Sequence, residues 1–204
     1  MEIINDIVGK NLKIYQNDEF FKFSLESVLL PNFVNINLRD KMILDLCTGN
    51  APIPLILSTK TKAKIYGVEL QEPVYNLGRI SIHENKMNDQ ITLINDDAKN
   101  LVNTFESDTF DVITCNPPYF KTNNKEFEND NEIKSLARHE KSLILEDIFV
   151  ISKKLLKNNG RLAMVHRTER FVEIIDVAKK YNFETKRIRF IYPNNKKISD
   201  LVLI

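Results

Sequence analysis

The chain has 204 residues, of which 43% are hydrophobic and 28% charged, and its formal net charge is +1. This size and composition predict one soluble domain with a good core and room for a small appendage. No apolar run approaches the ~18 residues of a membrane helix, and the first residues lack the layout of a signal peptide. We therefore expect a cytoplasmic protein without a membrane segment, either a monomer or a weak dimer.

The cysteine and histidine positions give no metal-binding pattern. Cys47 and Cys115 are far apart and belong to no Cys-x-x-Cys pair, and the three histidines are scattered along the chain. Zinc sites and disulfide frameworks need regular ligand or cysteine spacings, which are lacking here. The sequence predicts neither a metal site nor a disulfide.

Residues 1–37 are expected to form an extension that packs over one end of the main fold as a lid. Residues 12–16 and 20–23 flank a polar stretch and predict a hairpin. Ser24 is typical of a helix N-cap, and the helix after it would bury one face. That face consists of Leu25, Val28, Leu29 and Phe33.

Residues 38–204 show strands alternating with helices, which predicts one main domain. We predict strands at 42–46, 65–68, 91–94, 110–115, 161–165, 183–192 and 201–204. Helices are predicted from Pro52 and over 73–85, 98–105, 142–157 and 168–181, with residues 158–160 as a C-cap signal and Thr168 as an N-cap. The alternation predicts an α/β fold with a doubly wound, mostly parallel, seven-stranded sheet.

The strand at 110–115 ends abruptly in Asn116-Pro117-Pro118-Tyr119. Proline cannot donate a ladder hydrogen bond, and it keeps the preceding residue extended. The result is a stiff turn at the carboxyl end of a strand, which is the edge where an open parallel sheet binds its ligands.

These four residues suit the methylation of a planar nitrogen such as adenine N6. The Asn116 side-chain oxygen and the Pro117 carbonyl would each accept one N–H of the amine, which returns electron density to nitrogen. The Tyr119 ring offers a stacking face, worth about 1–3 kcal/mol per base. A merely rigid turn, with Tyr119 filling a groove, is equally consistent with the motif by itself.

Acidic residues end three successive strands, namely Asp45, Glu69 and Asp97, and Gly49 lies in the loop after the first. The second acid is placed to accept from ribose hydroxyls, and the third would accept from an adenine amine. Gly-x-Gly-x-x-Gly is absent, so a nucleoside without phosphates, such as S-adenosylmethionine, fits better than a dinucleotide. Any one such acid is also a common cap, but three in order are less easily explained by chance.

Basic residues are concentrated near the C-terminus. Residues 153–197 contain thirteen basic and four acidic side chains, a net charge of +9. This predicts a polyanion-binding surface, against the simpler alternative of a solvated face. Residues 120–135 are polar and asparagine-rich, which predicts a substrate-binding flap beside the Asn-Pro-Pro-Tyr turn.

Several motifs together resemble the bacterial tRNA1(Val) (adenine-N6)-methyltransferases over nearly the whole chain. They are Ile43-Leu-Asp-Leu-Cys-Thr-Gly-Asn, Gly67-Val-Glu-Leu-Gln, Cys115-Asn-Pro-Pro-Tyr-Phe, Ala137-Arg-His-Glu, Leu162-Ala-Met-Val-His-Arg and Phe23-Ser-Leu-Glu-Ser-Val-Leu-Leu. The resemblance implies a class I, Rossmann-like methyltransferase fold, S-adenosylmethionine as methyl donor and a target adenosine beside the anticodon of a tRNA.

The resemblance also implies roles for individual residues. Gly49 would approach the methionine part of the cofactor, Glu69 would hold the ribose and Asp97 would contact the adenine. The full cofactor-binding set expected is Asp45, Cys47, Gly49, Glu69, Leu70, Asp97, Ala98 and Asn116. The expected catalytic residues are Asn116, Pro117, Pro118 and Tyr119, and the expected substrate-binding residues are Tyr119, Phe120, Arg138, His139, Arg167, Arg170, Lys186 and Arg187.

One departure from the family pattern concerns the cofactor loop. Ala51 stands where the family usually has glycine, and Pro52 follows it. The extra Cβ would be tolerated if the Ala51 backbone has a negative φ.

The leading hypothesis is an S-adenosylmethionine-dependent adenine-N6 methyltransferase acting on tRNA. The methyl would pass in line to N6, with positioning and electrostatics supplying most of the rate, and the base would leave its stack. Three alternatives remain open. They are a protein glutamine N5-methyltransferase, a DNA adenine methyltransferase and a non-catalytic relative that binds RNA.

Overall fold

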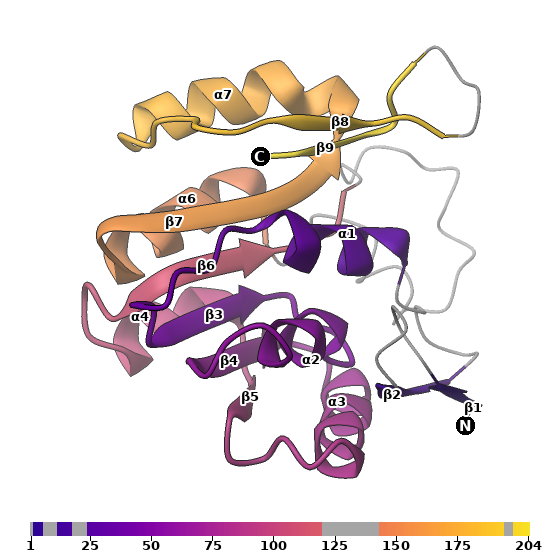
Figure 1. The fold of residues 1–204 in the computed structure, drawn as a ribbon. Helices are drawn as coiled ribbons and strands as arrows, with labels where there is room; N and C mark the ends of the chain where they lie inside the picture. The colour runs from indigo at the N-terminus through magenta and orange to yellow at the C-terminus, as the bar shows by residue number, and fades with distance from the viewer. Residues whose placement is uncertain (1, 6–11, 18–23, 120–142, 194–197) are drawn as a thin grey trace.

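The computed structural model describes residues 2–5, 12–17, 24–119, 143–193 and 198–204, and its centre is a seven-stranded sheet (Figure 1). Its strands, in spatial order, are β5 (Ile91–Asn95), β4 (Lys64–Glu69), β3 (Met42–Leu46), β6 (Phe110–Cys115), β7 (Leu156–Arg167), β9 (Leu201–Leu203) and β8 (Arg189–Ile191). Strands β5 to β7 pair in parallel, whereas β9 is antiparallel to both β7 and β8. The predicted doubly wound, mostly parallel α/β fold is confirmed.

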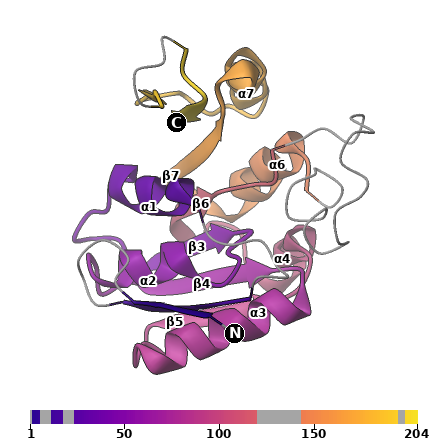
Figure 2. The same cartoon turned by 90° about the vertical axis from the view of Figure 1, so that its right-hand side faces the viewer.

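Helices cover both faces of this sheet (Figure 2). Buried side chains of α1 (Leu25–Phe33), α2 (Pro52–Ser58) and α3 (Glu72–Glu84) belong to one core cluster. The other cluster is built by η1 (Ala98–Asn100), α4 (Leu101–Thr104), α6 (Leu145–Leu155) and α7 (Phe171–Lys180). Successive side chains of a strand point to opposite faces, so Ile43 packs in the first core and Leu44 in the second.

The N-terminal strands lie over α3 and the loop after β3. β2 (Lys13–Gln16) pairs antiparallel with β1 (Glu2–Asn5). The expected hairpin pairing of residues 12–16 with 20–23 cannot be compared, because residues 20–23 lie outside the described part. Tyr15 N donates to Ser81 Oγ at 3.0 Å, and Asn50 Nδ2 donates to Tyr15 O at 2.8 Å. These bonds fix β2 against α3 and the β3 loop, while the lid and the domain boundary at residue 37 stay predictions.

The predicted buried face of α1 is wrong at its first member. Leu25 is 61% exposed, whereas Leu30 is fully buried. Phe33 is buried as predicted, and Val28 and Leu29 pack partly buried against the same core. Ser27 is also buried, so the buried stripe is shifted away from Leu25 toward Ser27 and Leu30. Periodicity gave the helix but left its rotation open, because apolar residues occur on several sides of this short element.

Two predicted capping signals have other structural roles. Residues 158–160 are not a C-cap, because α6 ends at Leu155 and β7 begins at Leu156. Asn159 takes φ +63° inside β7, next to an irregular register with β6, so the turn-like signal marks a distortion of the strand. The Thr168 hydroxyl caps no helix either, because it bonds Ser199 Oγ at 2.9 Å.

The predicted C-terminal strand pair exists, but its first strand, β8, is shorter than predicted. β8 spans Arg189–Ile191 rather than 183–192, because β9 reaches only Leu201–Leu203 and pairs with three residues there. The helix predicted over 98–105 is divided into η1 and α4.

Candidate active site

The carboxyl ends of β3, β4, β5 and β6 meet at one edge of the sheet, on the right in Figure 1. The register places Leu46 level with Val68 on one side and with Cys115 on the other. Glu69 lies level with Asn95 on β5. The loop after β3, the acid that ends β4 and the Asn-Pro-Pro-Tyr turn after β6 are therefore neighbours, as the strand order predicted.

The loop after β3 has an unusual backbone conformation. Cys47, Gly49 and Ala51 all take positive φ, at 55°, 59° and 71°. Ala51 therefore lacks the negative φ at which its Cβ would be tolerated, and each non-glycine residue in this region costs roughly 1–2 kcal/mol. Ala51 is fully buried, and its carbonyl accepts Leu55 N to start α2. Cys47 shares this strain, and no residue pattern around it indicates this.

Glu69 ties the β3 loop to the end of β4. Its two carboxylate oxygens accept from Gly49 N at 3.0 Å and from Gln71 N at 2.9 Å. The side chain is 7% exposed, and burial raises its pKa. A Cβ added to Gly49 would meet no atom within 4 Å, so open space lies over this peptide. The arrangement fixes a carboxylate beside a bare stretch of backbone.

Asp45 is fully buried at the end of β3, under the same loop. Thr114 Oγ1 donates to its Oδ1 at 2.6 Å, while Oδ2 has no hydrogen-bond partner among the described residues. Burial raises the pKa of Asp45 to about 7. A buried acceptor with a free lone pair is expensive unless a ligand or a proton occupies it.

Asp97, the residue expected to contact the cofactor adenine, lies at the same edge as Leu70 and Ala98, two further residues expected to bind the cofactor. Asp97 accepts from Lys99 N at 2.9 Å and caps η1, which agrees with the simpler capping interpretation. Ala98 is buried behind it, whereas Leu70 is 42% exposed after β4. All three positions border the loop region formed by the ends of β4 and β5.

Gly67 allows the β3 loop to pack closely against β4 and β5, and Gly67→Ala tests this. An added Cβ would lie 2.7 Å from Leu93 Cδ2 and 2.8 Å from Thr48 Oγ1. We expect a loss of about 1–3 kcal/mol in the free energy of unfolding, measured with urea. Leu93→Ala opens space on one side, so the double variant should lose less than the sum of the two single variants. Additive losses would contradict the predicted clash.

The Asn-Pro-Pro-Tyr turn forms a hydrogen-bonded unit. Tyr119 Oη donates to Asn116 Oδ1, and Asn116 Nδ2 donates to Ser27 Oγ of α1 at 3.2 Å. Pro117 and Pro118 are buried, which stiffens the turn. Burial also raises the pKa of Tyr119 well above its usual value, so the phenol stays protonated.

His166, which the sequence did not single out as a site residue, lies against Tyr119. The two ring centroids are 5.3 Å apart, and the planes are inclined by 60°. His166 Nδ1 accepts from Arg167 N at 2.8 Å, and Arg170 Nη1 is 3.5 Å from Nε2. Burial, followed by the charge of Arg170, lowers the pKa of His166 to about 3, so the ring is neutral. The available signal was its position near the end of a strand adjacent to β6.

The expected substrate-binding residues are not gathered in one place. Arg167 ends β7 beside the turn, but Arg170 is buried, and its guanidinium bonds both oxygens of Glu173. This does not fit the expected contact of Arg170 with a phosphate. Lys186 and Arg187 precede β8 and line a cavity elsewhere. Phe120, Arg138, His139 and the predicted flap at 120–135 lie outside the described residues.

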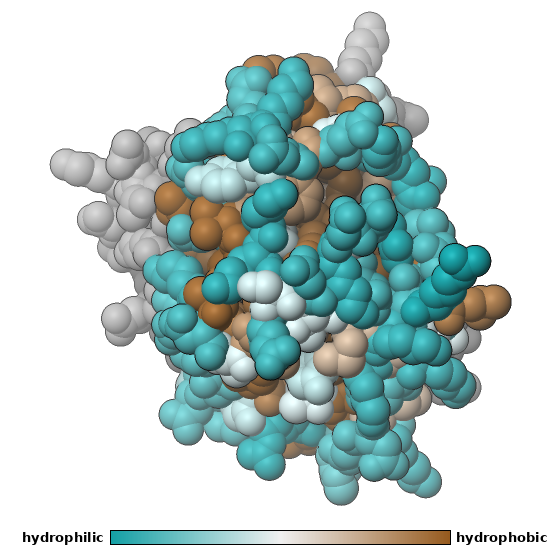
Figure 3. Space-filling model, turned by 90° about the vertical axis from the view of Figure 1, so that its left-hand side faces the viewer, coloured by the Kyte–Doolittle hydropathy of each residue, from teal (hydrophilic) through white to brown (hydrophobic). Residues whose placement is uncertain are grey.

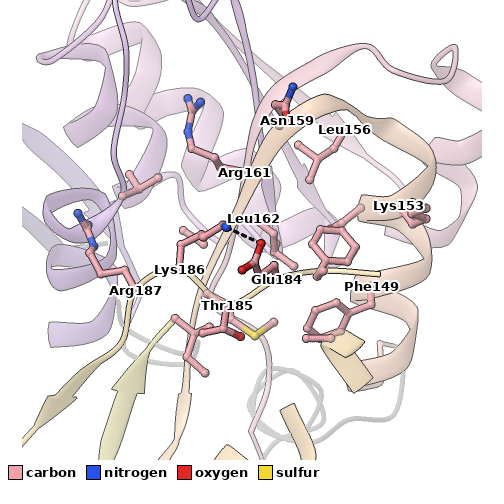
Figure 4. Close-up of a pocket in the computed structure, with 18 of the residues that line it drawn as sticks. Phe149, Lys153, Leu156, Asn159, Arg161, Leu162, Glu184, Thr185, Lys186 and Arg187 are labelled. Carbon is pink, nitrogen blue, oxygen red and sulfur yellow. Dashed lines mark hydrogen bonds and ion pairs between the residues drawn. The ribbon is translucent and has the colours of Figure 1, made fainter. Parts of the chain in front are cut away.

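That cavity measures about 900 Å³ and is lined by residues where β7 begins, such as Leu156, Asn159 and Arg161 (Figure 4). Because β7 runs parallel to β6, its beginning lies at the edge opposite the Asn-Pro-Pro-Tyr turn. Figure 3 views this edge and shows apolar residues set in a largely hydrophilic surface. Lys186 pairs with Glu184, and the Arg187 guanidinium lies 4.1 Å from the ring centroid of Phe33. The fold therefore separates Lys186 and Arg187 from Arg167 and the Asn-Pro-Pro-Tyr turn.

The sheet order, the tight loop after β3 and the Asn-Pro-Pro-Tyr turn after β6 together define a class I, Rossmann-like methyltransferase. Known proteins bear this out at the level of families. The chain belongs to the Eco57I restriction-modification methylase family, whose family model matches residues 53–198.

Individual relatives agree with this assignment. The tRNA1(Val) (adenine(37)-N6)-methyltransferase of Flavobacterium psychrophilum is 26% identical over 95% of this chain and 82% of its own length. The protein of the same name from Aliivibrio salmonicida is 28% identical over 89% of this chain and 75% of its own. The structure of P. horikoshii TYW2 in complex with MeSAdo covers 96% of this chain and 68% of its own, with a TM-score of 0.67 and 14% identity. That likeness concerns the fold.

The described residues contain neither a membrane-spanning helix nor a metal-binding cluster. None of the helices in the described ranges has both the length and the apolar character of a bilayer span. In the same part of the chain, no group of three or more His, Cys, Asp or Glu side chains is arranged to hold a metal ion.

Proposed function

We propose that this protein is an S-adenosylmethionine-dependent methyltransferase that acts on the exocyclic N6 amine of an adenosine in tRNA, of the tRNA1(Val) adenine-37 type. The observation that carries the proposal is the turn after β6, where Asn116 Oδ1 lies within hydrogen-bond reach of the Tyr119 hydroxyl. This acceptor sits at the strand edge beside the β3 loop. The names of the curated relatives support tRNA as the substrate.

The residues at this edge fit S-adenosylmethionine. Open space over Gly49, the fixed carboxylate of Glu69 and the unsatisfied Asp45 Oδ2 suit a ligand with hydroxyl and amine donors. When bound, the cofactor supplies an electrophilic methyl group. The residues proposed to hold it are Asp45, Cys47, Gly49, Glu69, Leu70, Asp97, Ala98 and Asn116.

The chain's own groups would act on the target amine. The Asn116 side-chain oxygen and the Pro117 carbonyl accept its two N–H groups, which raises electron density on nitrogen. The Tyr119 ring provides a face for the base. The turn is stiff because both prolines are buried, so the acceptors are positioned before the substrate arrives. The methylated amine becomes acidic and loses its proton to water, so no strong base is required.

Methylation of an unmodified tRNA transcript tests the proposal. Purified protein, transcript and cofactor are incubated, and the nucleosides are analysed by mass spectrometry for N6-methyladenosine. Product on tRNA supports the proposal, whereas methylation of proteins instead would favour the glutamine N5 alternative. Cofactor binding by calorimetry with no product on either substrate would favour a non-catalytic RNA-binding relative.

We also propose that Arg167 at the end of β7, together with Lys186 and Arg187 before β8, contacts the tRNA backbone. Phe120, Arg138 and His139 are proposed to contact the tRNA as well, whereas Arg170 is excluded because Glu173 already binds it. Phosphate contacts release counterions, so affinity should fall by about 0.7–0.9 log unit per tenfold rise in salt for each phosphate. A cytoplasmic location and a monomeric or weakly dimeric state likewise stay predictions.

Reversing the charge of Lys186 and Arg187 tests this surface. We expect Lys186→Glu/Arg187→Glu to weaken tRNA binding. The slope of log affinity against log salt should become shallower by the amount that corresponds to about one to two lost phosphate contacts. Lys179→Glu/Lys180→Glu on α7 is the matched control. It reverses the same number of charges at two exposed residues, of which Lys180 forms an ion pair with Glu146 as Lys186 does with Glu184. Equal slopes for wild type and the first variant would remove this segment from the RNA surface.

A further inference from the structure

Both ends of the Asn116 side-chain amide are already bonded in this structure. Its oxygen accepts from the Tyr119 hydroxyl, and its nitrogen donates to Ser27 Oγ at 3.2 Å. The two bonds differ in what methyl transfer requires of them. The proposed reaction, on which this inference rests, needs the oxygen as an acceptor for the target amine. The bond from Tyr119 must therefore be exchanged, whereas the bond to Ser27 can persist throughout.

The orientation of this amide matters because its two ends have opposite hydrogen-bonding character. The oxygen accepts a hydrogen bond from an amine, whereas the NH₂ group is a double donor and would oppose the amine's own hydrogens. A half-turn of the amide exchanges the ends with little change in shape. Some neighbour must hold the nitrogen while the oxygen exchanges partners.

Ser27 is suited to this role because α1 is held firmly. Ser27 is 5% exposed, and Leu30 and Phe33 on the same helix are buried. Lys60 Nζ donates to Pro31 O and to Asn32 Oδ1, each at 2.6 Å. The helix is thus fixed both in the core and at its C-terminal end. Ser27 itself lies 89 residues before Asn116 in the chain.

We propose that Ser27 is a positioning residue for methyl transfer. Its hydroxyl accepts from Asn116 Nδ2 and so keeps Asn116 Oδ1 directed at the target amine while the Tyr119 hydroxyl leaves. Ser27 itself contacts neither the cofactor nor the target. Its effect is therefore on the rate of transfer and depends entirely on Asn116.

Kinetics of Ser27→Ala test the proposal. We expect kcat on tRNA to fall by roughly tenfold, the scale of one lost hydrogen bond, with unchanged cofactor affinity. Ser27→Thr keeps the hydroxyl and should recover most of the rate. Ser152→Ala is the matched control, because Ser152 is a fully buried helical serine whose hydroxyl has no hydrogen-bond partner among the described residues, and its kcat should equal that of wild type.

A double-mutant cycle separates positioning from a general structural effect. In an Asn116→Ala background, Ser27→Ala should cause no further loss, because the amide that it orients is gone. A further tenfold loss there, or wild-type kcat in Ser27→Ala, would overturn the inference.

The contact itself is also tested without turnover. The Asn116 side-chain NH₂ signals, assigned by their disappearance in Asn116→Ala, should shift in the ¹⁵N spectrum of Ser27→Ala but not of Ser152→Ala. An inactive wild-type protein would overturn the proposed function, but the spectra would still test the hydrogen bond between Asn116 and Ser27. Unshifted signals would overturn the Ser27 inference whatever the activity.

Discussion

Asn116→Ala should lower methyl transfer to tRNA by about 10²–10³-fold, the usual scale for a lost transition-state hydrogen bond. The substitution removes the acceptor of the Tyr119 hydroxyl and, in the proposed reaction, of the target amine. Cofactor affinity should fall much less than the rate of transfer, because the β3 loop and Glu69, which belong to the same proposed cofactor site, keep their own backbone contacts. Single-turnover rates and calorimetry measure the two quantities separately.

Asn88→Ala serves as the control for this prediction. Asn88 is exposed and lies away from β6, and its side-chain Nδ2 is 3.4 Å from His83 Nδ1. Its removal should leave both transfer and cofactor binding as in wild type. Wild-type turnover by Asn116→Ala would refute the proposed grip on the amine, whatever the effect on binding.

Asp45→Asn should stabilise the protein at neutral and higher pH when no ligand is bound. The pKa of Asp45 rises from 3.8 to about 7 on folding, because the carboxyl group is buried. As pH rises through 3.8, the unfolded chain ionises first, so stability falls between about pH 4 and pH 7 and then stays low. At about 1.4 kcal/mol per pKa unit, this cost approaches 4 kcal/mol, and the asparagine variant avoids it.

Urea unfolding of wild type and Asp45→Asn at several pH values measures this difference. It should grow from pH 5 to pH 7 and level off above that. Thr114 Oγ1 can still donate to the remaining oxygen, so packing is preserved. Thr114→Val is the matched comparison, because it removes that donor without changing the charge. A difference independent of pH would show that Asp45 titrates normally in the folded protein.

Sequence reasoning succeeded where a local signal has one structural meaning. An apolar run closed by two prolines predicts the end of a strand, and β6 ends at Cys115 as expected. The strands at 42–46 and 91–94 were also placed to within a residue. Turn-forming signals were less reliable, because residues such as Asn159 and Thr168 suit a bulge or a tertiary contact as well as a cap.

The positions of the candidate site residues were likewise predictable where they follow from strand order, and not where they depend on tertiary packing. Asp45, Glu69 and Asn116 were correctly predicted to lie at one edge, because strand order alone brings their strand ends together. Ser27 and His166 were not singled out, because their contacts with Asn116 and Tyr119 exist only after α1 and β7 have packed. Arg170 was misplaced, since charge in a sequence does not reveal burial against a carboxylate such as Glu173.

The sequence by itself determined the order of strands and helices, the class of fold and the motif at the end of β6, because these depend on periodicity, proline chemistry and short-range spacing. The tertiary structure alone decided which face α1 buries, that Ala51 adopts a positive φ and that Lys186 and Arg187 lie away from the turn. These features depend on contacts between residues far apart in the chain. Such contacts leave no pattern in any one local stretch of sequence.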